Sequence, residues 1–98
     1  MREYELTVVI QSKLDEEARN ELLERVAGWL THSEDEAEKP IVHHWGQRRL
    51  AYPINKNKDG YYVLFEAQLD PPRLSEMERN FLYEDDILRH LLVRKEDK

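Results

Sequence analysis

The sequence predicts an α+β protein in which extended segments alternate with two amphipathic helices. Three observations support this class: apolar and polar residues alternate near the start of the chain, apolar residues recur three and four apart in two later segments, and glycine and proline are few. The chain has 98 residues, of which 40% are hydrophobic and 37% charged, as is typical of folded proteins. We therefore expect a single domain over residues 1–98.

The first predicted element is a strand over residues 1–11, where Tyr4, Leu6, Val8 and Ile10 alternate with polar residues and so share one side. A helix should follow, because Asp15 can cap it and apolar residues then recur at helical spacing, namely Ala18, Leu22, Val26, Trp29 and Leu30. We expect this helix to end near Thr31, before a polar, acid-rich loop over residues 32–39.

Two strands paired as a hairpin are predicted next. Residues 41–54 read as an edge strand, because Pro53 cannot donate to a ladder, and Gly46 is a candidate β-bulge. Residues 55–60 are predicted to form a turn and residues 61–69 the second strand of the hairpin. On strand periodicity, Tyr61, Val63 and Phe65 should belong to the core.

A second helix is predicted to start with a cap at Asp70, followed by Pro71 and Pro72, and to bury an apolar stripe made of Leu74, Met77, Phe81 and Leu82. Residues 87–95 form the last predicted strand. The order strand, helix, strand, strand, helix, strand predicts the ferredoxin-like βαββαβ fold. In this fold, two helices cover one face of a four-stranded antiparallel sheet.

The residue types that enzymes use are sparse, so we predict no catalysis, no metal, no cofactor and no small-molecule substrate. Cysteine is absent, and three glycines supply neither a phosphate-binding loop nor a G-x-S-x-G elbow. His43 and His44 are adjacent in a predicted strand, so they point to opposite faces and cannot easily share an ion. With neither a signal peptide nor an apolar run of about 20 residues, we expect a cytoplasmic protein outside the membrane.

The net charge of −6 argues against nucleic acid, but its distribution along the chain does not. Residues 1–40 carry 5 basic and 11 acidic side chains, whereas residues 41–58 carry only basic ones, namely Arg48, Arg49, Lys56 and Lys58. A second acid-free stretch, residues 87–95, contains Arg89, Arg94 and Lys95. If the fold brings both stretches to one side, they form a basic surface that suits phosphates; the alternative is an edge strand with solvated arginines.

Several motifs resemble the bacterial small-subunit ribosomal protein six family: Met1-Arg2-x-Tyr4-Glu5, Trp45-Gly46-x-Arg48-x-Leu50-Ala51-Tyr52-Pro53-Ile54, Gly60-Tyr61-Tyr62, and Arg89. The resemblance covers nearly the whole chain. It implies a structural protein that binds 16S ribosomal RNA in the platform of the small subunit, together with ribosomal protein eighteen.

The resemblance also implies which residues face RNA: Arg2, Trp45, Arg48 and Arg49, with Arg89 and Arg94 as further candidates. Lys56 and Lys58 are added on charge alone. Arginine suits this role because its fixed fork of donors matches phosphate oxygens, and an aromatic ring can add a flat contact against sugar or base. We expect the acidic run over residues 33–38 to point away from the RNA.

Other functions remain open for this fold. A ferredoxin-like regulatory or ligand-binding module would use the open sheet face or an edge strand, and an acylphosphatase-like hydrolase ranks third. RNA-recognition domains share the topology and stack bases on their central strands. Here Asp59 stands where their motif has Lys or Arg, and Tyr62 stands where it has a small residue, so we do not expect base stacking on the sheet as the main mode.

Overall fold

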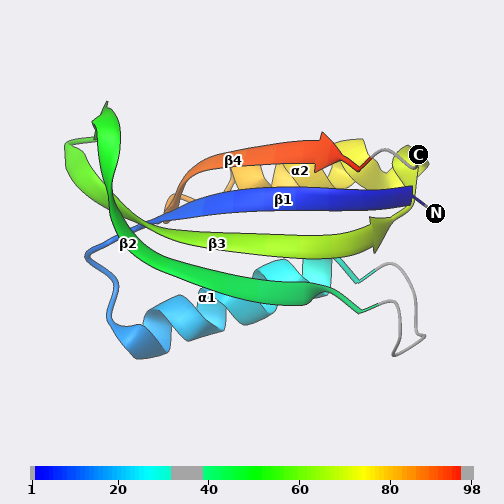
Figure 1. Ribbon diagram of the computed structural model, residues 1–98, viewed down its shortest axis with the longest axis horizontal. Coiled ribbons are helices and arrows are strands. Elements are labelled where there is room, and N and C mark those ends of the chain that lie inside the picture. Colours follow the sequence, from blue (N-terminus) through cyan, green and yellow to red (C-terminus); the bar gives the residue numbers. More distant parts are fainter. Residues whose placement is uncertain (1, 32–38, 96–98) are drawn as a thin grey trace.

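The computed structural model describes residues 2–31 and 39–95, which form one antiparallel sheet with two helices packed on one of its faces (Figure 1). The elements follow the predicted order and confirm the ferredoxin-like fold: β1 (Arg2–Gln11), α1 (Glu16–Trp29), β2 (Ile41–Ile54), β3 (Asn57–Leu69), the short 3-10 helix η2 (Pro71–Arg73), α2 (Leu74–Leu82) and β4 (Ile87–Arg94). The predictions for residues 32–38 lie outside the described residues.

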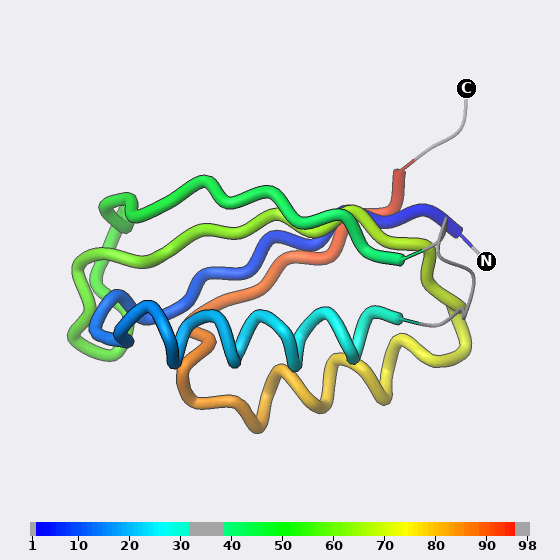
Figure 2. Tube along the Cα trace, turned by 90° about the horizontal axis from the view of Figure 1, so that it is seen from below, coloured from blue at the N-terminus to red at the C-terminus, as the bar shows by residue number. Residues whose placement is uncertain are grey.

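The sheet has the strand order β2-β3-β1-β4, so β2 and β4 are its two edges. β3 and β4 each run antiparallel to β1, and β2 pairs antiparallel with β3 as the predicted hairpin. Figure 2 shows the sheet edge-on, with α1 and α2 on one side of it and no helix on the other. The second face, which we call the open face, is therefore covered by neither helix.

The core lies between the sheet and the helices, as the apolar spacing predicted. Tyr4, Leu6, Val8 and Ile10 of β1 are all buried, and Val63 and Phe65 of β3 lie beside them. The helices contribute further buried side chains, namely Leu22, Leu23, Val26, Leu30, Met77 and Phe81. Each fully buried large side chain contributes about 1.5–3 kcal/mol relative to an exposed one, so this layer supplies most of the stability.

The first helix is capped as predicted, whereas the second begins differently. Asp15 accepts a hydrogen bond from the Ala18 amide at 2.7 Å, and α1 ends at Trp29 with Leu30 as its C-cap, close to the predicted end. The second helical segment opens with η2, and the Asp70 side chain does not make the predicted cap hydrogen bond. The predicted burial of Leu82 is wrong, since this residue is 76% exposed. Leu82 directly follows the buried Phe81, so its side chain points to a different side of the helix, away from the sheet.

Candidate nucleic-acid interface

The predicted site depends first on the β2–β3 hairpin, whose turn is tighter than the sequence suggested. β2 runs to Ile54 and β3 begins at Asn57, so the connection is only Asn55 and Lys56 rather than residues 55–60. Both residues have positive φ angles, 47° and 66°, which is the geometry of a type I′ turn and matches the twist of paired strands. Asn57 Nδ2 donates to the carbonyls of Ile54 and Asn55, which fixes the turn that presents Lys56 and Lys58.

A β-bulge at Gly46 was predicted and is confirmed. The pairing with β3 shifts between His44 and Gly46, and Gly46 has a φ of 89°, a conformation that glycine tolerates best. The residue accommodated by this shift is Trp45, whose side chain is 47% exposed on the edge strand. The bulge therefore leaves an aromatic ring in solvent a few residues before the arginines.

Arg48 and Arg49 lie side by side in sequence but on opposite faces of the sheet. Arg48 is opposite Gly60 and Arg49 is opposite Asp59, and directly paired residues share a face. The alternation along β3 assigns Gly60 to the open face and Asp59 to the helix side, since Val63 and Phe65 point to the core. The two guanidinium groups therefore straddle the edge strand, and a bound phosphate chain would have to follow that edge to reach both.

A second irregularity in the hairpin was not predicted. Arg49 pairs with Asp59 and Ile54 pairs with Asn57, so four residues of β2, numbers 50–53, face the single residue Lys58. Within this wide bulge Leu50 is buried, with 9% of its side chain exposed, and it packs over Gly60 and Val9. A Cβ at Gly60 would lie 2.5 Å from Val9 Cγ1, so glycine is what allows this close approach.

The bulge brings β2 to the opposite edge of the sheet. The hairpin tip bends across the end of the sheet where β1 finishes and β4 begins (Figures 1 and 2). Arg89 Nη1 on β4 donates to Tyr52 Oη at 3.4 Å, and Asn55 lines a cavity together with Leu88 and Arg89. Arg89 thus joins the hairpin cations at what we call the hairpin end, defined by Arg48, Arg49, Lys56, Lys58 and Arg89.

The other two predicted cations lie elsewhere. Arg2 pairs with Leu69 and Arg94 pairs with Tyr4, at the end of the sheet where β1 starts. The five residue steps along β4 from Arg89 to Arg94 correspond to roughly 17 Å of strand. The fold therefore brings together one acid-free stretch and only the beginning of the second, and Arg2 and Arg94 are not part of the hairpin end.

Carboxylates also approach the hairpin end. Asp59 lies opposite Arg49, although no ion pair between the described residues joins the two, and two carboxylates of the turn before β4 have other partners. The turn before β4 carries Glu84 and Asp86; Glu84 forms an ion pair with Arg25 at 3.2 Å, and Asp86 accepts a hydrogen bond from Gln11. Among residues 2–31 and 39–95, no ion pair involves Arg48, Arg49, Lys56, Lys58 or Arg89. These five cations are exposed, so their charges are available to a phosphate.

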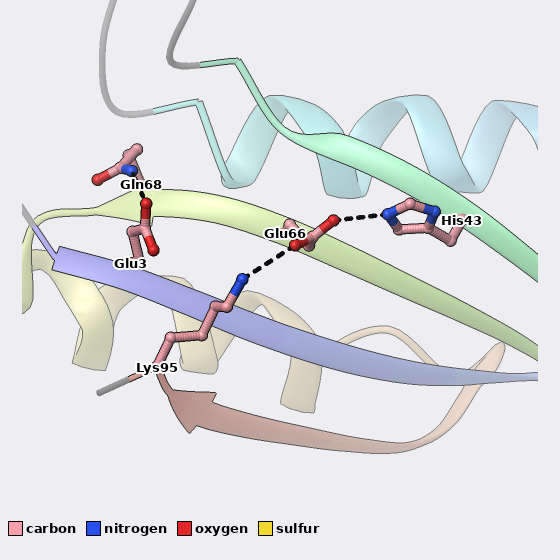
Figure 3. A network of polar contacts seen from close by, with 5 residues as sticks. All are labelled: Glu3, His43, Glu66, Gln68 and Lys95. Carbon is pink, nitrogen blue, oxygen red and sulfur yellow. Dashed lines mark hydrogen bonds and ion pairs between the residues drawn. The ribbon is translucent and has the colours of Figure 1, made fainter. Parts of the chain in front are cut away.

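The opposite end of the open face, which we call the terminal end, is built from paired charges (Figure 3). Glu66 accepts hydrogen bonds from His43 Nε2 at 2.6 Å and from Lys95 Nζ at 3.1 Å, so three elements meet at one carboxylate. These two contacts, first that of His43, lower the pKa of Glu66, and the Glu66 carboxylate raises the pKa of Lys95. Beside them, Gln68 Nε2 donates to Glu3 Oε1 at 3.1 Å.

The described residues contain no group of three His, Asp or Glu side chains that could hold a metal ion. Of the two histidines singled out, His43 binds Glu66 on the open face and His44 Nδ1 lies 3.0 Å from Tyr61 Oη on the helix side. Within the same described part of the chain, no helix is long and apolar enough to cross a membrane.

Sequence reasoning missed two parts of this arrangement, Leu50 as a packing anchor and Tyr52 as a hydrogen-bond partner of Arg89. The sequence contains a weak indication of the role of Leu50, because it is a large aliphatic residue between Arg49 and Pro53 in an otherwise exposed edge strand. The contact between Tyr52 and Arg89 joins residues 37 apart on opposite sheet edges, and no local pattern reports such a pair.

Comparison with known proteins gives consistent matches over almost the full length. The family model described as ribosomal protein S6 matches residues 3–94. A curated relative, small ribosomal subunit protein bS6 of Alkaliphilus oremlandii (strain OhILAs), is 42% identical over 100 residues, which cover 98% of this chain and 99% of the relative. The crystal structure of 30S ribosomal protein S6 from Thermotoga maritima superposes with a TM-score of 0.84 at 30% identity, covering 96% of this chain and 87% of that one.

Proposed function

This chain belongs to the ribosomal protein S6 family, and on that premise we propose that it binds 16S ribosomal RNA through its hairpin end, together with ribosomal protein eighteen. A member of this family is a structural constituent of the small ribosomal subunit, associated with the ribosome and not an enzyme. We also propose that the protein is located in the cytoplasm.

The observation that carries the proposal is the group of five exposed cations at the hairpin end of a protein whose net charge is −6. Arg48, Arg49 and Arg89 can each present several N–H donors to phosphate oxygens, and Lys56 and Lys58 add point charges at the turn. Trp45 and Tyr52 offer exposed rings nearby. Such a surface suits contacts with phosphate and sugar on a folded RNA, which position a protein without reading much sequence.

Arg2 and Arg94 are proposed as weaker RNA contacts, separate from those of the hairpin end. They lie at the terminal end, so a single short RNA segment on the hairpin does not reach them. Their pairing with the core residues Leu69 and Tyr4 puts both on the helix side of the sheet. We propose that they touch RNA only where the folded molecule extends around this end of the sheet, and that their contribution is smaller than that of the hairpin arginines.

A basic partner is expected because most of this protein repels RNA. Three glutamates, Glu3, Glu5 and Glu66, lie close together on the open face near the chain ends, because Glu5 is opposite Glu66 in the register of β1 and β3. This acidic group can contact a protein of opposite charge. We propose ribosomal protein eighteen as this partner, as the family resemblance implies. The isolated chain should therefore bind RNA weakly, with the partner completing the RNA-binding surface.

Reconstitution of small subunits tests the proposal. The variant Arg48→Ala with Arg49→Ala should lose incorporation, since each charge-assisted contact is worth about 1.5–3 kcal/mol. The matched control is Arg73→Ala with Arg79→Ala, which removes two arginines from the helix layer and should incorporate normally. Omitting ribosomal protein eighteen should also lower incorporation of the wild type.

Equal incorporation of the two double variants would contradict the RNA role of the hairpin end. Incorporation that does not depend on ribosomal protein eighteen would contradict the partner role alone. Urea unfolding of both variants checks that each is folded, so a loss of incorporation reports on the surface and not on stability.

A further inference from the structure

The hairpin tip is held by side chains, because its main-chain pairing is interrupted. Residues 50–53 of β2 face only Lys58, so the ladder to β3 does not fix their direction. Regular antiparallel pairing fixes each strand through closely spaced hydrogen bonds, and a bulge of this size leaves several main-chain groups without that restraint. Contacts outside the hairpin must therefore decide where Lys56 and Lys58 lie relative to Arg48.

Two contacts perform this task on the two sides of the bulge. Leu50 packs over Gly60 and Val9, which anchors the start of the bulge on the sheet. Two residues later, the hydroxyl of Tyr52 accepts a hydrogen bond from Arg89 Nη1, which ties the far part of the bulge to β4. Since β2 and β4 are the opposite edges of the sheet, the second contact closes the hairpin across its end.

We propose that Tyr52 and Arg89 are positioning residues for RNA binding: their contact holds the bulged part of β2 against β4, so that the cations of the turn and those of the ladder face the same RNA. This inference rests on the proposed function and adds a role that charge alone does not give. A guanidinium has five N–H donors, and the contact with the Tyr52 hydroxyl uses only one of them. Arg89 can therefore orient the hairpin and still offer its outer donors to a phosphate.

A direct phosphate role and a positioning role make different predictions for Tyr52. If Arg89 only contacts phosphate, then removing the Tyr52 hydroxyl leaves the RNA affinity unchanged, because the charge and the aromatic ring both remain. If the contact positions the hairpin, the hydroxyl and the guanidinium act as a unit, and their effects on affinity are coupled.

The experiment is a double-mutant cycle with Tyr52→Phe, Arg89→Gln and the two combined. RNA affinity is measured on a 16S ribosomal RNA fragment in the presence of ribosomal protein eighteen. Two matched controls are Tyr83→Phe, which removes the hydroxyl of an exposed tyrosine after α2, and Arg79→Gln, which removes the same charge from the helix layer. Amide hydrogen exchange of residues 50–57 is followed in the same proteins without RNA.

We expect Tyr52→Phe to weaken RNA binding by about two- to tenfold, the range that one hydrogen bond gives, while Tyr83→Phe has no effect. Arg89→Gln should cost clearly less affinity in the Tyr52→Phe background than in the wild type. Exchange in residues 50–57 should be faster in both single variants and no faster in the double variant. A purely structural role would lower the melting temperature without this coupling in affinity.

Two results would overturn the inference. One is wild-type affinity for Tyr52→Phe, or effects of Tyr52→Phe and Arg89→Gln that simply multiply. The other is unchanged exchange of residues 50–57 in both single variants. Failure of the wild type to bind the RNA fragment with its partner would overturn the proposed function itself, and the exchange data would still report whether the contact holds the hairpin.

Discussion

The hairpin end and the terminal end of the open face both contain basic side chains, yet they use them in opposite ways. At the terminal end, His43 and Lys95 both donate hydrogen bonds to Glu66, so these contacts tie β2 and the residue after β4 to β3. At the hairpin end, Arg48 and Lys56 form no ion pair with any described residue. A polyanion is therefore expected to bind where the cations have no carboxylate partner, and not simply where cations are numerous.

Charge reversal at each end should have the largest effect, and it tests directly whether RNA binds at the hairpin end rather than at the terminal end. We expect Arg48→Glu with Arg49→Glu to weaken RNA binding by more than about 100-fold, because two attractive contacts become repulsive. The matched variant Arg2→Glu with Arg94→Glu changes net charge equally at the terminal end and should weaken binding by less than about fivefold. Filter binding at one fixed salt concentration measures both.

Losses of similar size in the two double variants would show that the RNA covers both ends. The general effect of net charge is the same in both proteins, so only the position of the charges can produce a difference between them.

Packing at Gly60 is the next point of contrast, because the hairpin end depends on one close contact. Gly60→Ala places a Cβ against Val9 and Leu50, and overpacking of this kind costs about 1–3 kcal/mol of unfolding free energy. Gly28→Ala is the matched control: the Cβ at Gly28 in α1 meets nothing within 4 Å, and alanine should stabilise the helix by up to about 1 kcal/mol. Urea unfolding measures both changes, and equal destabilisation would contradict the packing role of Gly60.

The sequence was sufficient for the parts of the fold that local patterns determine. Alternation in β1, the Asp15 cap, the spacing in α1 and the bulge at Gly46 were all predicted from neighbours within a few residues. The turn was predicted too long, because Asn55 and Lys56 both adopt positive φ angles and allow the ladder to continue to the tip. Leu82 was misassigned because its apolar character suggested burial, whereas one residue after the buried Phe81 lies about 100° further around the helix axis and so points away from the sheet.

The candidate site was predictable in composition but not in arrangement. The acid-free stretch groups the hairpin cations in sequence, whereas the faces of the sheet on which they lie depend on registers that no local pattern contains. Arg48 and Arg49 separate to two faces because the strand period is two, and Arg89 and Arg94 separate because β4 runs the length of the sheet. Within the wide bulge at residues 50–53, Leu50 packs at Gly60, where Val9 also lies, and Val9 belongs to a strand that is not adjacent to β2.

The smallest expected effect is the pH dependence of stability at the terminal end, which comes from Glu66 and Lys95. The lowered pKa of Glu66 means that the native state favours the carboxylate, so its contribution to stability is present at neutral pH and is lost as the pH falls through about 4 and below. The raised pKa of Lys95 acts in the opposite direction, and its contribution is lost only as the pH rises past the ordinary lysine range. Both contributions are therefore complete near pH 7.

We expect Glu66→Gln to lower the urea midpoint slightly at pH 7 and to have a progressively smaller effect as the pH falls below the ordinary glutamate range and the wild-type carboxylate becomes protonated. Glu76→Gln on exposed α2 is the control and should behave as the wild type over the same pH range. RNA affinity at pH 7 should be the same for Glu66→Gln and the wild type, because the change frees a lysine about one sheet length from the hairpin end. A gain or loss of RNA affinity in this variant would mean that the Glu66 cluster itself takes part in RNA binding, and the assignment of a purely structural role to this cluster would fail.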